Sequence, residues 1–460
     1  MNLIEIARVL KQAADPTTAH EPPVQQILLD SRKLAKGDIF VALAGENFDG
    51  HDFIEAAVNR GAIAVICEKK PSHVLPVPCW VVPSSLQALA DIASYYRQTI
   101  HCPIIAVTGS NGKTSVKEMI HSILPKPSHA TPGNLNNHIG VPLSLLALSP
   151  EDRYAVFELG ANHPGEIAYT VAMVKPDVTL INNIGPAHIG GFGSLEGVAR
   201  AKGEIYQGLG AGGTAVVNND DAFANFWDNL LIDKKVLRFS LHNQGNVTAK
   251  DIRFNAEGCA VFTLVLPGDQ IQVALQVPGE HMILNALAAA TCCYAVGISG
   301  QDIARGLMAF RGVAGRMTFL TGKNKSLIID DTYNANLRSV LTAIEVLAKR
   351  QGQRILVLGD LGELGDFTQA HHEEIGRVAR EKGVDLVLTC GTHSKFTADT
   401  FGKNAKHYTN HKTLVADLKT YLDENTTVLI KGSRAAAMEN VVQELVSSCQ
   451  NQRGKQCSIG

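Results

Sequence analysis

The segment that most constrains the fold is a glycine-rich loop between an apolar strand and a helix. It reads Thr108-Gly109-Ser110-Asn111-Gly112-Lys113-Thr114 and follows the apolar run Ile104–Thr108. Glycines allow a backbone to wrap around an anion, and the N–H groups and dipole of a new helix favour phosphate. Lys113 would then reach the β- and γ-phosphates of a nucleotide, and the Thr114 hydroxyl would hold Mg²⁺.

An ordinary glycine turn before a helix is the alternative interpretation of this loop. Strand, glycines, Lys-Thr and helix all fall in register, which favours phosphate binding. Val107 stands where the longer form of the motif has glycine. The loop is therefore a shortened variant of that motif.

Apolar strands that end in polar loops alternate with helices along most of the chain. This alternation predicts an α/β protein with mostly parallel sheets, and 460 residues allow about three domains. The proline-rich residues 71–83 and the glycine-flanked residues 312–315 mark two boundaries. We expect a small α/β N-terminal domain at 1–83, a central P-loop mononucleotide-binding parallel sheet at 84–313, and a C-terminal Rossmann-like doubly wound sheet at 314–460.

The expected elements follow from these apolar runs. The strands are Ile27–Leu29, Ile39–Leu43, Ile63–Cys67, Ile104–Thr108, Val156–Leu159, Val178–Ile181, Ala215–Val217, Leu327–Ile329, Ile355–Leu358, Leu386–Leu388 and Val428–Ile430. The helices are Phe53–Arg60, Leu86–Thr99, Met282–Val296, Val340–Lys349, Thr368–Lys382 and Ala435–Val446.

Charge and cysteine content argue against several classes of protein. The chain has 42 Lys and Arg and 44 Asp and Glu, which gives a net charge of −2. It therefore lacks the overall positive charge that favours binding to nucleic acid or to an anionic membrane. The nine cysteines include no C-x-x-C pair, which is typical of reduced thiols. Residues 1–10 do not have the apolar core of a signal peptide, so we expect none, and Met282–Val296 is shorter than the roughly 20 residues of a membrane span. We expect a cytoplasmic monomer with no nucleic-acid partner and no membrane insertion.

Two residues lie where parallel sheets place active sites: Glu158 ends the expected strand Val156–Leu159, and His188 follows Ile184-Gly185-Pro186. Glu158 and His188 could ligate Mg²⁺, although imidazole is an uncommon partner for that ion. A salt-bridged glutamate and a capped loop histidine are the alternatives. Lys202, taken alone, looks like a surface helix lysine. The residues 190–194, Gly-Gly-Phe-Gly-Ser, form either a lid or a connector.

Two polar runs follow strands of the C-terminal unit. Asp330–Asn336 is a dense polar run, which more often marks a site than a turn. Lys431-Gly432-Ser433-Arg434 precedes an expected helix, and cations there oppose the helix dipole. An anionic ligand would explain these cations, and simple solvent exposure is the alternative.

Ordered motifs extend over nearly the whole chain. They are Asp30-Ser31-Arg32, Gly37–Leu43, Asp49-Gly50-His51, Thr108–Thr114, Asn134–Asn137, Glu158-Leu159-Gly160, Gly185–His188, Ala201–Ile205, His281 with Asn285–Ala289, Gly315-Arg316-Met317, Tyr333–Asn336, Leu358-Gly359-Asp360 with Glu363-Leu364-Gly365, and Lys431–Arg434. Together they resemble the ATP-dependent Mur ligases, which build the peptide stem of bacterial peptidoglycan. The Tyr333–Asn336 and Leu358–Gly365 runs resemble the last ligase of that pathway.

The resemblance implies a role for each matching residue. Thr108, Gly109, Ser110, Asn111, Gly112, Lys113 and Thr114 would bind the phosphates of ATP, and Asn285, Arg316 and Asp331 would contact adenosine or phosphate. Thr114, Glu158, His188 and Lys202 would hold two Mg²⁺ ions, with Lys202 carbamylated. Ser31 and Asn137 would lie near the UDP-sugar, and Tyr333, Asn336, Lys431 and Arg434 would bind substrate. Lys113, Lys202 and His188 are the expected catalytic residues.

The implied reaction joins D-alanyl-D-alanine to UDP-N-acetylmuramoyl-tripeptide through an acyl phosphate. Closure of the C-terminal unit about Gly312–Gly315 would assemble the reactants. Leu337 stands where the family has proline after Tyr-Asn-Ala-Asn, which we expect to loosen that turn. The alternatives are the preceding ligase, which adds the third amino acid, and a non-catalytic P-loop ATP switch. Folylpolyglutamate synthetases share the ligase core, but the Asp30-Ser31-Arg32 region argues against them.

Overall fold

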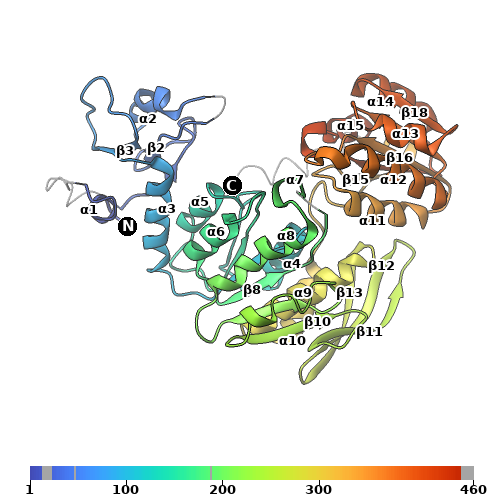
Figure 1. The fold of residues 1–460 in the computed structure, drawn as a ribbon, viewed down its shortest axis with the longest axis horizontal. Helices are drawn as coiled ribbons and strands as arrows, with labels where there is room; N and C mark the ends of the chain where they lie inside the picture. The colour runs from blue at the N-terminus through green and yellow to red at the C-terminus, as the bar shows by residue number, and fades with distance from the viewer. Residues whose placement is uncertain (13–22, 46–47, 187–188, 447–460) are drawn as a thin grey trace.

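Three β-sheets form the scaffold of the protein (Figure 1). The computed structural model describes residues 1–12, 23–45, 48–186 and 189–446. Within these residues the sheets have four, nine and six strands in chain order. The expected α/β architecture with three units is confirmed.

The N-terminal sheet is parallel throughout, in the order β1-β2-β3-β4. Its elements are α1 (Leu3–Val9), β1 (Ile27–Leu28), β2 (Ile39–Val41), α2 (Ile54–Asn59), β3 (Ala64–Cys67), β4 (Cys79–Val81) and α3 (Ser85–Arg97). Apolar residues of α1 and α3 cover one face and those of α2 the other. The sequence did not predict β4, because this three-residue strand lies inside the proline-rich stretch that looks like a linker.

Helix α3 belongs to two hydrophobic cores. Leu89 and Ile92 pack against the N-terminal sheet, whereas Ala90 and Ala93 pack against the central one. Figure 1 shows the helix running from the N-terminal sheet to α5 and α6 of the central unit. Ser84 caps it by accepting a hydrogen bond from the Gln87 N–H at 3.2 Å. The boundary expected after residue 83 thus falls just before a helix shared by both units.

The central sheet has the order β13-β12-β11-β10-β9-β8-β5-β7-β6. Its elements are β5 (Ile104–Thr108), α4 (Lys113–Ile123), β6 (His129–Ala130), α5 (Gly140–Leu146), β7 (Ala155–Glu158), α6 (Glu166–Val174), β8 (Val178–Ile181), α7 (Ile189–Phe192), α8 (Leu195–Gly203), β9 (Thr214–Asn218), β10 (Lys235–Ser240), β11 (Val247–Phe254), β12 (Cys259–Leu266), β13 (Asp269–Pro278), α9 (His281–Ala295) and α10 (Gly300–Ala309). Helices α4, α9 and α10 pack on one face, and α3, α5, α6 and α8 on the other.

The central sheet is mostly parallel, as expected, and it ends in an antiparallel edge that the sequence did not predict. Strands β11, β12 and β13 form an antiparallel meander, while every pairing from β6 to β11 is parallel. The turns between these strands contain Gly258 and Gly268, which have φ values of 80° and 85°. No helix separates the three strands, so the search for strand–helix alternation missed them.

The C-terminal sheet has the order β14-β15-β19-β16-β17-β18, and only β14 is antiparallel. Its elements are β14 (Thr318–Thr321), β15 (Leu327–Asp331), α11 (Leu337–Ala348), β16 (Gln353–Gly359), α12 (Thr368–Glu381), β17 (Leu386–Cys390), α13 (Lys395–Phe401), β18 (Ala405–Tyr408), α14 (His411–Leu418), β19 (Thr426–Lys431) and α15 (Glu439–Leu445). Helices α11 and α12 cover one face and α14 and α15 the other, so the doubly wound arrangement is confirmed.

The last predicted helix begins later than expected. Residues Arg434–Ala436 form a short 3₁₀ turn, and Ala437 has a φ of 47°. This left-handed residue interrupts the helix, which starts at Glu439 instead of Ala435. The dipole argument for Lys431 and Arg434 was therefore wrong, because neither residue lies at the N-terminus of α15.

The long apolar segment Met282–Val296 forms the buried helix that was predicted. In the described part of the chain, each helix falls short of the length and apolar character that crossing a bilayer requires.

Candidate functional site

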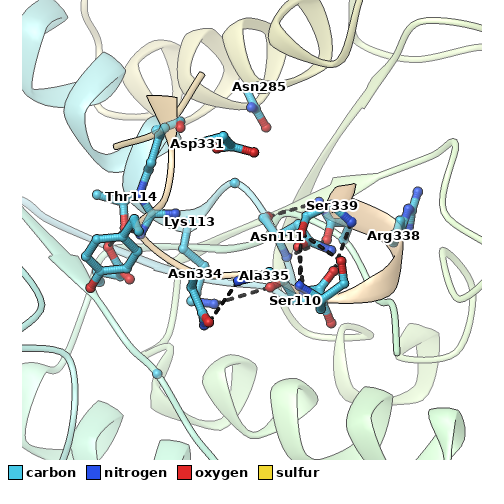
Figure 2. Close-up of a pocket in the computed structure, with 18 of the residues that line it drawn as sticks. Ser110, Asn111, Lys113, Thr114, Asn285, Asp331, Asn334, Ala335, Arg338 and Ser339 are labelled. Atoms are coloured by element: carbon cyan, nitrogen blue, oxygen red, sulfur yellow. Dashed lines mark hydrogen bonds between the residues drawn. The ribbon is translucent and has the colours of Figure 1, made fainter. Parts of the chain in front are cut away.

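A cavity of about 410 Å³ lies between the carboxyl ends of the central strands and the C-terminal unit. The phosphate-loop segment 110–115 and the strand end at Glu158 line it from the central side. Residues 315–317, 331, 333–336, 338 and 339 line it from the C-terminal side. Figure 2 shows the loop residues Ser110, Asn111 and Lys113 close to the segment that carries Asn334 and Ala335. The two units thus meet where a parallel sheet places its active site.

The glycine-rich loop is held by asparagines that follow β8. Gly109 and Gly112 have φ values of 152° and 78°. A Cβ on Gly112 would lie 2.6 Å from the side-chain nitrogen of Asn182, so this position requires glycine. The Asn111 N–H donates to Asn183 Oδ1 at 2.9 Å, and the Ser110 hydroxyl donates to the Gly185 carbonyl at 3.0 Å. The loop is therefore fixed before any ligand arrives.

Lys113 is the first residue of α4 and folds back over its own loop. Its ammonium donates to the Gly109 carbonyl at 2.8 Å. Burial lowers the pKa of Lys113, and the nearby Arg316 acts in the same direction, whereas Glu158 opposes them. Gly112 supplies no side chain to cap α4. The N–H groups at the start of α4, which no side chain caps, and the ammonium are the donors that an anion site requires.

Thr114 and Glu158 present oxygen atoms to the same cavity. The Thr114 hydroxyl donates to Glu158 Oε2 at 2.7 Å and accepts from Arg316 Nη2 at 2.8 Å. The other Glu158 oxygen accepts from Asn136 at 2.8 Å. The partners of this buried carboxylate are thus a hydroxyl and an amide, which argues against the salt-bridged alternative.

The donor set at Thr114 and Glu158 fits Mg²⁺. Both residues offer hard oxygen ligands, and Mg²⁺ usually keeps several waters and binds substrate phosphates through one or two carboxylates. No group of three or more His, Cys, Asp or Glu suited to a metal occurs among the described residues. His188, the other expected ligand on a strand end, lies outside the described residues.

Lys202 is buried in the protein, so its interpretation as a surface lysine was wrong. It is 1% exposed on α8, and its ammonium nitrogen lies 5.9 Å from the ring centroid of Phe192. Loss of hydration holds the pKa of Lys202 well below its usual value, and Lys113 adds to the effect. Phe192 belongs to α7, and Ser194 caps α8, so most of the 190–194 segment is ordered helix.

Three side chains of the C-terminal unit reach the phosphate-loop side of the cavity. Besides its bond to Thr114, Arg316 stacks over the Tyr333 ring with 4.1 Å between guanidinium carbon and centroid. Asn336 donates to Asn111 Oδ1 at 2.8 Å. Arg338 donates to the Ile184 carbonyl at 3.0 Å.

The turn before α11 is closed despite the missing proline. The Asn336 side chain accepts from the Ser339 N–H at 2.9 Å, and the Ser339 hydroxyl accepts from the Asn336 N–H at 3.0 Å. This reciprocal capping box satisfies two backbone donors. Leu337 occupies the first helical position, where proline is favoured but not required. The expected loosening of this turn is therefore corrected.

Asp331 and Lys431 form a buried ion pair between the neighbouring strands β15 and β19. The distance between Asp331 Oδ2 and Lys431 Nζ is 2.5 Å, and the Lys431 ammonium also donates to the Asn334 carbonyl at 2.9 Å. Solvent exposure does not explain Lys431, which is 2% exposed. Arg434 differs, because its exposed guanidinium pairs with Glu439 at 2.8 Å and does not line the cavity.

The remaining predicted residues fall into two groups. Asn285 and Asn137 line the cavity; Asn285 accepts from Asn182 at 3.0 Å, and Asn137 accepts from the Gly140 N–H at 2.8 Å. Ser31 is buried in the N-terminal unit and does not line this cavity. Thr108 lies beneath the loop as the last residue of β5, with its hydroxyl bonded to the Leu159 carbonyl.

Sequence reasoning missed the residues that support the site. Asn182 and Asn183 directly follow β8 and bind the loop, and the rule that polar residues follow functional strands could have found them. Nothing in the sequence around Arg338 predicted its role, because its hydrogen-bond partner Ile184 lies in another unit and the contact depends on how the two units pack.

The chain matches three family models. They are described as "Mur ligase family, catalytic domain" over residues 23–97, "Mur ligase middle domain" over 107–293 and "Mur ligase, glutamate ligase domain" over 315–434. A relative from Escherichia coli (strain K12) named UDP-N-acetylmuramoyl-tripeptide–D-alanyl-D-alanine ligase is 42% identical over 426 residues, which are 91% of this chain and 93% of the relative.

Solved structures of similar ligases also resemble this chain over nearly its whole length. A crystal structure of MurF from Acinetobacter baumannii superposes with a TM-score of 0.89 at 36% identity, covering 96% of this chain and 98% of that one. MurF ligase from Thermotoga maritima in complex with ADP gives a TM-score of 0.80 at 29% identity, covering 92% and 97%.

Proposed function

Because this chain belongs to the Mur ligase family, we propose that its cavity carries out the reaction for which its relatives are named. The protein is an ATP-dependent ligase that joins D-alanyl-D-alanine to UDP-N-acetylmuramoyl-tripeptide in peptidoglycan synthesis. One observation carries the proposal: the phosphate loop and the Tyr333–Asn336 segment line a single cavity, so that a nucleotide at the loop and an acceptor at the segment would meet there.

Nucleotide binding is assigned to the loop and the residues around it. Residues Ser110–Thr114 would surround the phosphates, with Thr108 and Gly109 supporting the loop from beneath, and Lys113 would exchange the Gly109 carbonyl for a γ-phosphate oxygen. Thr114 and Glu158 would hold Mg²⁺, which neutralises phosphate charge when bound. Asn285, Arg316 and Asp331 contact adenosine or phosphate, and the stacking of Arg316 on Tyr333 fixes the direction of its guanidinium.

The reaction needs an activated acyl group, because a carboxylate is a poor acyl donor. ATP phosphorylates the terminal carboxylate of the tripeptide, and the amine of D-alanyl-D-alanine then attacks the acyl carbon and displaces phosphate. Phosphoryl transfer is chiefly a matter of positioning and charge neutralisation. The Lys113 ammonium supplies that charge, and the asparagines that hold the loop supply the position.

The two substrates of the ligation are assigned to different sets of residues. Ser31 and Asn137 are assigned to the UDP-sugar, which extends beyond the cavity toward the N-terminal unit. Tyr333, Asn336 and Lys431 are assigned to the acceptor side. Arg434 is also assigned there, and it must leave Glu439 to take part.

Carbamylation of Lys202 stays a prediction, and none of the comparisons supports it. Only the neutral amine reacts with CO₂, and at an ordinary pKa of ~10.4 about 10⁻³ of the lysine is neutral at pH 7. Burial favours that form by lowering the pKa of Lys202. NMR with ¹³C-bicarbonate, Mg²⁺ and ATP should give a carbamate signal that disappears in Lys202→Gln. A spectrum without that signal removes the carbamate and, with it, Lys202 as a metal ligand.

A coupled assay of phosphate release tests the function directly. We expect release only when ATP, UDP-N-acetylmuramoyl-tripeptide and D-alanyl-D-alanine are all present, and no release when one is omitted. Activity with the dipeptide-bearing nucleotide and a single amino acid would overturn the proposal in favour of the preceding ligase. ATP binding without ligation of either nucleotide would instead indicate a non-catalytic switch.

The monomeric state and the cytoplasmic location also stay predictions. Light scattering on the purified protein tests the first, and fractionation of cells tests the second. A dimer mass would remove the expectation of a monomer.

A further inference from the structure

Two cysteines of the N-terminal sheet lie side by side. Cys67 is on β3 and Cys79 on the neighbouring edge strand β4, and their sulfur atoms are 3.5 Å apart. Val65 is opposite Cys79 and Cys67 is opposite Val81, so the two cysteines are diagonal neighbours on one face of the sheet. Both pack into the core beneath α2. No part of the proposed ligation uses either thiol.

The two thiols differ in their access to solvent. Cys67 is fully buried, whereas Cys79 is partly exposed at the start of β4. The segment before Cys79 is on the surface, with Val74 95% exposed. A hydrogen bond from the Cys67 thiol lowers the pKa of Cys79 and raises that of Cys67. A partly exposed thiol whose pKa is lowered by a neighbouring buried thiol is the arrangement of an attacking and a resolving cysteine.

We propose that Cys67 and Cys79 form a dithiol that hydroperoxides oxidise to an intramolecular disulfide. The Cys79 thiolate attacks one peroxide oxygen, so that an S–O bond forms, the O–O bond breaks and hydroxide leaves to become water. The Cys67 sulfur then attacks the Cys79 sulfenic acid; the S–S bond forms, the S–O bond breaks, and the lost thiol proton and hydroxide leave as a second water. Two thiols lose two electrons, and one hydroperoxide gains them.

The geometry of the sheet permits this closure. A disulfide requires the sulfur atoms to approach to about 2 Å. Cys67 is fixed by its position in an inner strand, but β4 is a three-residue edge strand that pairs only with β3 among the described strands. Pro78 precedes β4, and the surface segment before it connects the strand to the rest of the sheet. A small shift of β4 toward β3 therefore closes the bond without breaking the inner pairings.

Peroxide treatment of the reduced full-length protein tests the proposal. After alkylation of the remaining thiols, peptide mapping without reductant should find Cys67 linked to Cys79. Cys102 is the matched reference, because it is also partly exposed but burial raises its pKa. We expect Cys79 to react faster than Cys102, because the hydrogen bond from Cys67 lowers the pKa of Cys79 while burial raises that of Cys102, so that more of Cys79 is thiolate. The oxidation of Cys449 and Cys457, which lie outside the described residues, is quantified separately in the same peptide map.

Variants separate the two roles. In Cys67→Ser the sulfenic acid on Cys79 should persist and be captured by dimedone, whereas in Cys79→Ser the buried Cys67 should remain unmodified. Cys102→Ser should form the crosslink at the wild-type rate. Circular dichroism checks the fold of each variant, and the wild-type kinetics need no variant. Equal rates at Cys79 and Cys102, or a wild-type protein that links Cys79 to any other cysteine, would overturn the proposal.

Discussion

The N-terminal and C-terminal units are attached to the central unit by different kinds of contact. The first shares helix α3, whose Leu89 and Ile92 pack on one side while Ala90 and Ala93 pack on the other. The second touches the phosphate-loop side of the cavity through polar side chains: Arg316 bonds to Thr114, Asn336 to Asn111, and Arg338 to Ile184. The first attachment is a continuous apolar core. At the cavity the second consists of hydrogen bonds, and farther out Lys349 lies over the Phe254 ring and Arg350 donates to the Glu257 carbonyl.

This difference indicates which unit can move. If α3 separated from either sheet, apolar surface now buried in the shared core would be exposed to water. This exposure costs a free energy of roughly 25 cal/mol per Å². A hydrogen bond exchanged for one to water costs only about 0.5–1.5 kcal/mol net. The connector to the C-terminal unit also contains Gly312 and Gly315, both with positive φ. We infer that the C-terminal unit closes on its ligands while the N-terminal unit stays in place.

The largest expected effect comes from Arg316→Ala, which removes one polar contact and leaves both cores intact. Ligation should fall about 10²–10³-fold in kcat, the usual loss for one preorganised donor to developing charge. The free energy of unfolding from urea denaturation should change little. Arg311→Ala is the matched control, because that exposed arginine bonds only to neighbouring backbone carbonyls. A variant that unfolds at much lower urea would place Arg316 in the scaffold instead.

Leu89→Ala tests the apolar attachment. Leu89 is fully buried, and truncation of a buried leucine costs about 2–5 kcal/mol through lost burial and the cavity left behind. Urea unfolding followed by circular dichroism measures the loss. Val74→Ala, at a 95% exposed position, should change stability by less than about 0.5 kcal/mol. Equal stability of the two variants would contradict a structural role for α3.

Two histidines, the partly buried His129 and the fully buried His372, make the stability of the protein depend on pH. Burial lowers the pKa of both His129, on β6, and His372, on α12, from 6.5 to about 4. Between these values the unfolded chain binds the proton first, so stability is full above pH 6.5 and falls as the pH decreases toward 4. Each histidine should contribute up to about 3 kcal/mol to this loss.

Urea unfolding at a series of pH values, with His129→Gln and His372→Gln, measures the two contributions. Each variant should lose less stability between pH 6.5 and 4 than the wild-type protein does. A slope unchanged by both substitutions would show that other groups cause the acid sensitivity.

Asn336→Ser should have a smaller effect on the polar attachment. Serine keeps the helix cap of α11 but removes the amide that donates to Asn111. One hydrogen bond of about 1 kcal/mol corresponds to a loss of roughly fivefold in kcat/KM. Asn410→Ser is the matched control, since Asn410 caps α14 away from the cavity. An equal loss of activity in both variants would assign the effect to capping alone.

The smallest signal is a change of shape. Small-angle scattering should show a lower radius of gyration with an unreactive ATP analogue and both substrates than without them, because the C-terminal unit closes. Equal radii in the two conditions would contradict closure.

Local patterns predicted much of this fold. The apolar run Ile104–Thr108 and the glycines after it fixed the junction of β5 and α4, and most predicted strands lie within two residues of their observed ends. Strands β10–β13 were not predicted, because they do not alternate with α-helices along the chain as the other strands of this sheet do. The start of α15 was predicted too early, because an alanine gives no indication that its backbone is left-handed, as that of Ala437 is.

The candidate site was predictable where one segment carries it and not where two segments meet. The Thr108–Thr114 loop was found from its own residues. The pairing of Asp331 with Lys431 depends on β15 lying beside β19, which 100 residues of separation conceal. The burial of Lys202 depends on Phe192 and on the packing of α8, and a lysine between alanine and glycine gives no sign of it.

The Asp331–Lys431 pair has one more consequence under the proposed roles. Asp331 is assigned to the nucleotide and Lys431 to the acceptor, yet the two side chains neutralise each other. A ligand that pairs with Asp331 leaves the charge of Lys431 less neutralised, and a ligand that pairs with Lys431 has the same effect on Asp331. Each ligand therefore changes the electrostatic potential at the binding site of the other. The two binding equilibria are then thermodynamically linked, and reciprocity requires that each ligand change the affinity of the other by the same factor.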